Sequence, residues 1–187
     1  MILPILAYGD PVLKQEADEI EENYPHLQEL IDNMFETMYN SEGVGLAAPQ
    51  VGESIRLFII DASKMDESLD GLKRVFINPE VVELNGKKWD YEEGCLSIPH
   101  IREKVRRPDE IMINYLDENF EEQEERFTGL AGRVVQHEYD HIEGVLFTDH
   151  LSHLKRRMLK KKLDAISRGD VDVNYKMRFP VKKKRVS

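Results

Sequence analysis

The sequence predicts an α+β fold in which antiparallel β-sheets pack around a central helix that carries an HExxH pattern, with a further helix near each end. Two observations support this prediction. Short runs rich in β-branched and aromatic residues fill the stretch from about 56 to 127, while three-and-four spacing of apolar residues marks helices on both sides of it. Because strand-like runs are grouped instead of alternating with helices, the α+β class is favoured.

The first half of the chain predicts one helix and several strands. The opening MILPILAYGD predicts a short strand, since it lacks the basic start and the length of a signal peptide. Residues 24–40 predict an amphipathic helix. Strand-like runs follow at 56–61, at 74–84 with a break at Asn78-Pro79, and at 87–93. Residues 110–127 predict a hairpin that turns at 117–119.

Two helices follow the strands. The first is expected over about 130–143, with Gly144 at its C-terminal end. The second is expected over 151–166, and its apolar residues should pack on the body: Leu151, Leu154, Met158, Leu159, Leu163 and Ile166. We therefore expect a single catalytic domain over residues 1–166 and a basic C-terminal extension over 167–187.

Composition narrows the classes of function. A chain of 187 residues is long enough for one well-packed domain, and no apolar run reaches membrane-spanning length. The single cysteine excludes an internal disulfide and fits a reducing cytoplasm, so we expect a cytoplasmic protein without a membrane partner. Residues 151–187 carry 13 Lys or Arg against 3 Asp or Glu, whereas the preceding 150 residues carry 13 against 33. An acidic body with a basic end indicates one local docking feature instead of general nucleic-acid binding.

The pattern HEYDH indicates a metal site. His137 and His141 are four residues apart, so on a helix both imidazoles can reach one ion, and Glu138 can act as a base beside it. The alternative is a helix whose inward histidines are satisfied by hydrogen bonds in the core. Two histidines do not complete a site, so the choice depends on a third ligand.

The third ligand is not evident downstream. In the longer protease pattern the third histidine position is Phe147, and no glutamate follows Glu143. Cys95, within EEGCLSIP, would by itself more often be a small buried hydrophobe. Next to an HExxH pattern without another partner it becomes the favoured ligand. A thiolate with two imidazoles leaves one coordination position open, as catalytic sites require.

The stretch GVGLAAPQ, residues 43–50, matches a loose G-x-G-x-x-A nucleotide-binding pattern. That pattern needs a strand before it and a helix after it, whereas here a helix precedes and Pro49 follows, so we expect no nucleotide cofactor. One interpretation is a plain loop. The other is a strand edge kept bare of side chains so that a peptide can lie against it, with Gln50 as an amide donor beside the metal.

The blocks GVGLAAPQ, EGCLS and QHEYDH, in this order and at these separations, resemble peptide deformylase, and the resemblance extends over residues 3–166. It implies that one divalent ion is held by Cys95, His137 and His141. Iron(II) is the family's usual ion, and zinc, nickel or cobalt can replace it. It also implies hydrolysis of N-formylmethionyl nascent peptides, with Glu138 as proton carrier. The Gln50 amide and the Leu96 main-chain N–H would stabilise the formyl oxygen.

The same resemblance implies a substrate pocket. The methionine side chain would lie among Val44, Leu130, Val134 and the His137 ring, and the strand edge at Gly45 would pair with the substrate backbone. Arg133 stands where many members carry an apolar residue, and we expect its head to reach water over an apolar stem. Asp140 either pairs with Arg107 in support of the site or is solvated.

Two other functions are considered. A metallo-endopeptidase of the HExxH type would have no role for the glutamine and cysteine blocks, and a decayed ribosome-binding protein would be expected to have lost Glu138, Cys95 or Gln50. The basic C-terminal helix and tail predict docking to the ribosome, because ribosomal RNA would attract them. The alternative is a solvated helix face. The basic residues concerned are Lys155, Arg156, Arg157, Lys160, Lys161, Lys162, Lys182, Lys183, Lys184 and Arg185.

Overall fold

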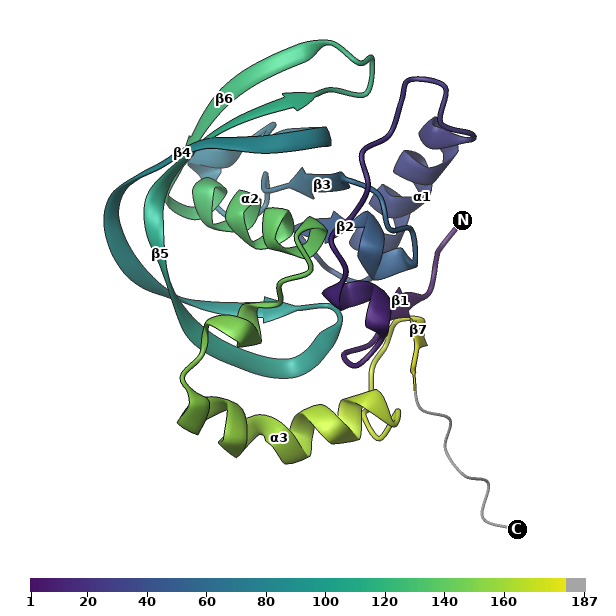
Figure 1. Ribbon diagram of the computed structural model, residues 1–187, viewed down its shortest axis with the longest axis vertical. Coiled ribbons are helices and arrows are strands. Elements are labelled where there is room, and N and C mark those ends of the chain that lie inside the picture. The colour runs from purple at the N-terminus through teal and green to yellow at the C-terminus, as the bar shows by residue number, and fades with distance from the viewer. Residues whose placement is uncertain (181–187) are drawn as a thin grey trace.

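A five-stranded antiparallel sheet organises the protein (Figure 1), whose computed structural model describes residues 1–180. The predicted basic tail at 182–185 lies outside the described residues. The strands follow the order β2 (Gly45–Ala47), β3 (Leu57–Asp61), β4 (Lys73–Cys95), β5 (Ile98–Leu116) and β6 (Glu122–Thr128). A separate parallel pair joins β1 (Ile5–Leu6) to β7 (Met177–Arg178).

Helices α1 (Leu27–Asn40) and α2 (Gly129–Ile142) pack against the sheet, and α3 (His153–Ser167) follows. Successive side chains of a strand point to opposite faces, and β3 buries both. Leu57 and Ile59 join the core that contains α1, whereas Phe58 and Ile60 join the core that contains α2. The predicted α+β class is confirmed, and α2 is the central helix.

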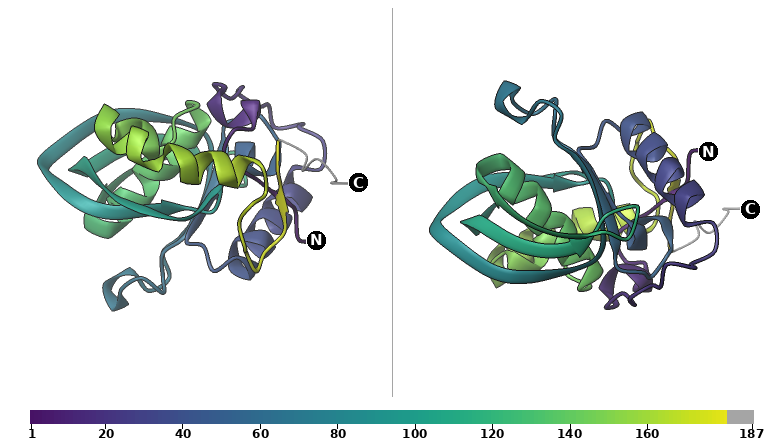
Figure 2. Two further views of the ribbon diagram at one scale, coloured as in Figure 1. Left: turned by 90° about the horizontal axis from the view of Figure 1, so that it is seen from below. Right: turned by 90° about the horizontal axis from the view of Figure 1, so that it is seen from above.

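The hairpin formed by β4 and β5 curves around α2 (Figures 1 and 2). The prediction of separate strands at 74–84 and 87–93 is wrong, because β4 runs without interruption through both. The Asn78-Pro79 break is instead a register irregularity, where Asn78 has φ 47° and its side chain bonds to both main-chain groups of Ile20. The first part of β5 was not predicted, because its buried Ile101 and Val105 stand among charged residues.

The end of α2 agrees with the sequence. Gly144 has φ 71°, and the N–H of Val145 donates to the carbonyl of Asp140 at 2.9 Å, which satisfies a free carbonyl of the last turn. A Cβ at Gly144 would lie 2.6 Å from the carbonyl oxygen of Lys14, so glycine is also required by the close packing of the N-terminal segment.

Helix α3 buries only part of its predicted apolar side. Leu151, just before the helix, and Leu159, Leu163 and Ile166 within it are buried, as expected. Leu154 and Met158 are not, since they are 67% and 71% exposed. After α3 the chain returns across the molecule to form β7, so residues of the predicted extension pack on the body. Within residues 1–180, no helix has the length and apolar character needed to span a membrane.

Candidate metal centre

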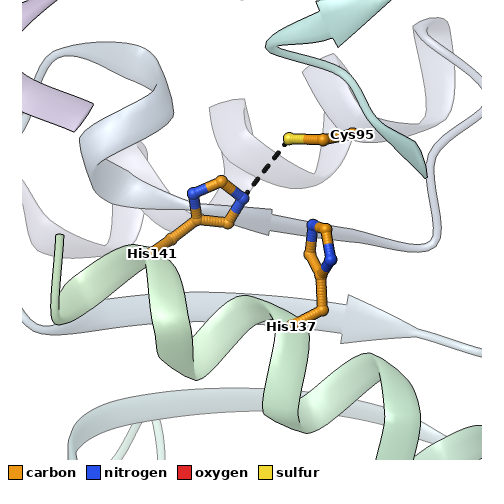
Figure 3. A group of neighbouring side chains, drawn as sticks. All are labelled: Cys95, His137 and His141. Carbon is orange, nitrogen blue, oxygen red and sulfur yellow. Dashed lines mark hydrogen bonds between the residues drawn. The ribbon is translucent and has the colours of Figure 1, made fainter. Parts of the chain in front are cut away.

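Two elements bring the three predicted ligands together. Helix α2 carries His137 and His141 one turn apart, and the tight turn between β4 and β5 presents Cys95 (Figure 3). One ligand atom from each residue lies within 4.8 Å of the others. Cys95 Sγ is 3.4 Å from His141 Nε2.

These donors fit a divalent ion. With metal–sulfur bonds near 2.3 Å and metal–nitrogen bonds near 2.0–2.1 Å, tetrahedral geometry separates the ligand atoms by about 3.3–3.6 Å. The Cys95–His141 separation of 3.4 Å falls in this range. A set of one thiolate and two imidazoles leaves a fourth position that can face the adjoining cavity, which Cys95, His137 and Glu138 all line.

Glu93 orients His137, a function that sequence analysis missed. The Glu93 carboxylate is buried, and its Oε1 lies 2.9 Å from Nδ1 of His137. An ionised carboxylate can only accept, so His137 donates through Nδ1 and keeps Nε2 free for an ion. The available signal was its position two residues before Cys95, but the strand has a register irregularity between the two, so regular alternation does not place them on one face.

Two buried arginines, Arg107 and Arg133, balance the charge of Glu93. Arg107 donates to both of its carboxylate oxygens, at 2.7 and 3.0 Å, and also to Asp140 at 2.8 Å. Asp140 is therefore paired and not simply solvated. Its other partner is His150 Nε2, 2.8 Å from the same oxygen. The His137 ring is thus held by a connected set of buried charges.

The expectation that the head of Arg133 reaches water is wrong. Arg133 is only 2% exposed and donates to Glu93 at 2.9 Å and to the carbonyls of Val105 and Trp89, each at 2.8 Å. Its guanidinium also lies 4.7 Å from the centroid of the Trp89 ring. A planar group with several fixed donors suits this arrangement, which explains how an arginine occupies a buried position next to the site.

The side-chain carbonyl oxygen of Gln50 holds this residue beside Cys95. It lies in the 3-10 helix Ala48–Val51, and its Oε1 accepts from the N–H of Ala47 at 2.9 Å. Its amide Nε2 then points to Cys95 Sγ at 3.4 Å and to Ser97 Oγ at 3.2 Å. Ser97 is a second residue that the sequence did not single out.

The environment sets the ionisation of the two reactive groups. Burial by itself would raise the pKa of the Cys95 thiol, but the imidazoles of His141 and His137 lower it to about 5. Burial raises the pKa of Glu138 to about 6, against the opposing effect of the two histidines. Oε2 of Glu138 is buried without a hydrogen-bond partner among the described atoms, which indicates a group placed to exchange a proton with a bound molecule.

Gly45 is required by the position of Glu138. A Cβ at Gly45 would lie 2.5 Å from Oε1 of Glu138, closer than real side chains approach. Gly45 begins β2, which within residues 1–180 pairs with β3 alone and therefore forms an edge of the sheet. The bare strand edge predicted from the sequence is present, next to the proposed proton carrier.

A cavity of about 790 Å³ opens beside the three ligands. Four of the five residues predicted for the substrate pocket line it, namely Val44, Gly45, Arg133 and Val134. Leu130 is half-buried on α2 but is not among the residues that line this cavity. The wall includes residues that the sequence did not indicate: Met65, Tyr91, His100, Arg102, Asp172, Val173, Asn174 and Tyr175.

Comparisons with known proteins agree with one another. The sequence model of the family described as polypeptide deformylase matches residues 2–157. The chain is 57% identical to the peptide deformylase of Christiangramia forsetii, covering 98% of this chain and 99% of that protein. It is 54% identical to the peptide deformylase of Cytophaga hutchinsonii, covering 98% and 100%. A crystal structure of a peptide deformylase from Legionella pneumophila shares the fold with a TM-score of 0.78 and 42% identity, covering 88% of this chain and 94% of that one.

Proposed function

The chain belongs to the polypeptide deformylase family, and we infer its reaction from that membership. Members are metal-dependent hydrolases that remove N-formyl groups, and this chain is such an enzyme. We propose that its substrates are N-formylmethionyl nascent peptides in the cytoplasm, which it converts to formate and a peptide with a free amino terminus. The observation that carries the proposal is the buried Glu138 beside the Cys95, His137 and His141 cluster, since its Oε2 has no hydrogen-bond partner within residues 1–180.

Cys95, His137 and His141 would hold one divalent ion, for which Fe(II) is our choice, with Zn(II), Ni(II) or Co(II) as replacements. When bound, such an ion supplies a Lewis acid and lowers the pKa of coordinated water to about 7. Glu93 keeps His137 in the tautomer that this requires, through the 2.9 Å contact at Nδ1.

Glu138 is proposed to move the proton. Its carboxylate accepts a proton from the attacking water and then delivers it to the departing amine of the peptide. Burial raises the pKa of this carboxyl group above its ordinary value, which makes the carboxylate a better proton acceptor. Gly45 leaves room for this carboxylate at the wall of the cavity.

Gln50 and Leu96 are proposed to stabilise the charge that develops on the formyl oxygen. The Gln50 amide is fixed by Ala47 and points toward Cys95, so it needs no reorganisation during the reaction. The main-chain N–H of Leu96 follows Cys95 directly in the turn. Loss of one such donor typically lowers turnover by about 10²–10³-fold.

The substrate's methionine side chain is proposed to lie in the cavity against Val44 and Val134, near the His137 ring. Leu130 is the weaker candidate, since it does not line this cavity. The free edge of β2 at Gly45 offers main-chain groups to the substrate backbone. Arg133 is proposed to support this wall instead of meeting solvent, because both of its terminal nitrogens donate to buried acceptors.

The test compares three peptides that begin with the same Met-Ala-Ser sequence. An Fe(II)-loaded sample prepared without oxygen should release formate from formyl-Met-Ala-Ser, with little release of acetate from the acetylated form. The third peptide is acetylated at its N-terminus and extended at its C-terminus, and its internal peptide bonds should remain uncut. Internal cleavage without formate would favour the metallo-endopeptidase alternative, for which the Gln50 contacts have no use.

Ribosome docking is a second, separate proposal. On α3 the exposed Arg157, Lys161 and Lys162 carry no ion pair within residues 1–180, whereas Lys155 pairs with Glu103 and Lys160 with Asp164. Spacings of three and four residues along α3 place these cations next to the exposed Leu154 and Met158, which gives the helix a basic and partly apolar outer face. Four to six phosphate contacts would give a log–log salt slope of roughly −3 to −5.

Charge reversal tests the docking. A variant with Arg157, Lys161 and Lys162 changed to Glu should bind purified ribosomes more weakly and still hydrolyse a free formyl peptide. The matched control changes Lys87, Lys88 and Lys104, exposed residues of the β4–β5 hairpin, to Glu and thus alters net charge equally. Equal binding by the two variants would remove the docking proposal and leave the hydrolase assignment unchanged.

A further inference from the structure

The turn that presents Cys95 and Leu96 is held by two distant segments. Cys95 pairs with Ile98, so Leu96 and Ser97 are its two central residues. Carbonyls in such a turn lie outside the strand ladder and need other partners. The carbonyl of Ser97 accepts from the N–H of Tyr8 at 2.8 Å, and that of Leu96 accepts from the hydroxyl of Tyr175 at 2.7 Å.

Tyr175 belongs to the segment after α3, beyond residue 157, where the match to the family's sequence model ends. The segment is fixed to the body on both sides of Tyr175. The N–H groups of Ile5 and Ala7 donate to the carbonyls of Lys176 and Arg178, each at 2.9 Å. Figure 1 shows β7, in yellow, beside β1, in purple. On the other side, His100 Nε2 lies 2.5 Å from the carbonyl oxygen of Asp172.

The segment also borders the reaction site. Residues 172–175 line the same cavity as Cys95 and Glu138. The Tyr175 ring is half-buried and packs against the hydrophobic core that contains α1, as does Leu96. Ring and hydroxyl therefore have separable functions, one in packing and one in holding the Leu96 carbonyl.

We propose that Tyr175 is a positioning residue, through which the C-terminal segment aims the N–H of Leu96 at the formyl oxygen. The N–H and carbonyl of Leu96 lie on either side of one Cα, so fixing the carbonyl limits the rotations that would turn the N–H away. A preorganised donor stabilises developing charge better than a mobile one. This inference rests on the proposed role of Leu96 and deepens it.

Tyr175→Phe tests the proposal, because it removes the hydroxyl and keeps the ring. Tyr24→Phe is the matched control: Tyr24 packs against the same core, and its hydroxyl bonds at 3.2 Å to Glu53, which does not line the cavity. With Fe(II) and formyl-Met-Ala-Ser, Tyr175→Phe should lower kcat by about 2–10-fold, the size of one hydrogen bond's net contribution, with KM nearly unchanged. Tyr24→Phe should leave both constants unchanged.

A second measurement does not depend on turnover. In ¹⁵N-labelled zinc-loaded protein, the amide resonances of Leu96 and Ser97 should shift in Tyr175→Phe and stay in place in Tyr24→Phe. If the wild type is active and Tyr175→Phe has the same kcat, or loses no more kcat than Tyr24→Phe does, the inference about Tyr175 is wrong. The proposed function is then unaffected. Unmoved amide resonances also overturn it. Absence of formate release by the wild type overturns the proposed function itself.

Discussion

Nδ1 of His137 lies 2.9 Å from Oε1 of Glu93, a carboxylate that also receives hydrogen bonds from Arg107 and Arg133. This contact joins the proposed metal ligand to a buried ionic network that reaches from strand β4 to helix α2. The ring of His137 cannot turn without breaking the contact, so its Nε2 is oriented before any ion arrives.

Glu93→Gln should therefore weaken metal binding. The amide is nearly the same size but accepts less strongly from His137 and loses the charge that balances the two arginines. Removal of such a partner typically lowers metal affinity by about 10–100-fold. Competition with a chelator measures the affinity, and Glu92→Gln, an exposed neighbour, is the control. Equal affinity in both variants would show that Glu93 does not act through His137.

Cys95→Ala should lose the ion, because no other thiolate or carboxylate replaces it among the described ligand groups. We expect wild-type protein prepared without oxygen to hold about one divalent ion per chain, and Cys95→Ala to hold far less under the same conditions. His153→Ala, a histidine on α3 outside the cluster, should keep the ion. Full metal content in Cys95→Ala would refute the assigned ligand set.

Arg133 should contribute to stability through its burial. Arg133→Met leaves Glu93 with one cationic partner fewer and removes the Arg133 hydrogen bonds to two carbonyls, which typically costs about 3–5 kcal/mol of unfolding free energy. Arg106→Met, which breaks an exposed pair with Asp90, should cost about 0–1 kcal/mol. Urea denaturation of both variants gives the two values. If both variants lose a similarly small amount of unfolding free energy, the Arg133 contacts contribute little to stability.

The iron form should be sensitive to air. Cys95 is the only cysteine of the chain, so oxidation of the ion or of this thiolate would account for any loss of activity. We expect the Fe(II) form to lose activity in air within minutes to hours and the Ni(II) form to keep it. Mass spectrometry of Cys95 separates the two routes. Equal persistence of both forms would argue against Fe(II) as the working ion.

The site was predictable where its parts are local. His137 and His141 are one helical turn apart, and Cys95 followed from the absence of another partner and from the resemblance. Glu93 was not predictable in the same way, because its partners Arg107, Arg133 and His137 are 14, 40 and 44 residues away. Such pairs form only when β4, β5 and α2 pack together.

The incorrect predictions also concern contacts between residues that are far apart in the sequence or irregular pairing within a strand. An arginine on a helix is normally solvated, and only the Trp89 and Val105 carbonyls together with Glu93 explain why Arg133 is buried. Strand β4 was divided between residues 84 and 87 at Asn85-Gly86, a pair that is common in turns, whereas here the strand continues through a register irregularity. The pairing of Ile5 with Met177 joins opposite ends of the described chain and leaves no local signal.

The most direct test of the proposed mechanism measures metal content and formate release on the same samples of wild type and Glu138→Gln. Glu138 is a proton carrier in this account and not a ligand, so the variant should keep about one ion per chain. Its formate release should fall by about 10²–10⁴-fold, the usual contribution of general acid–base catalysis. A Glu138→Gln variant that retains its ion and turns over formyl-methionyl peptide at the wild-type rate would contradict the account.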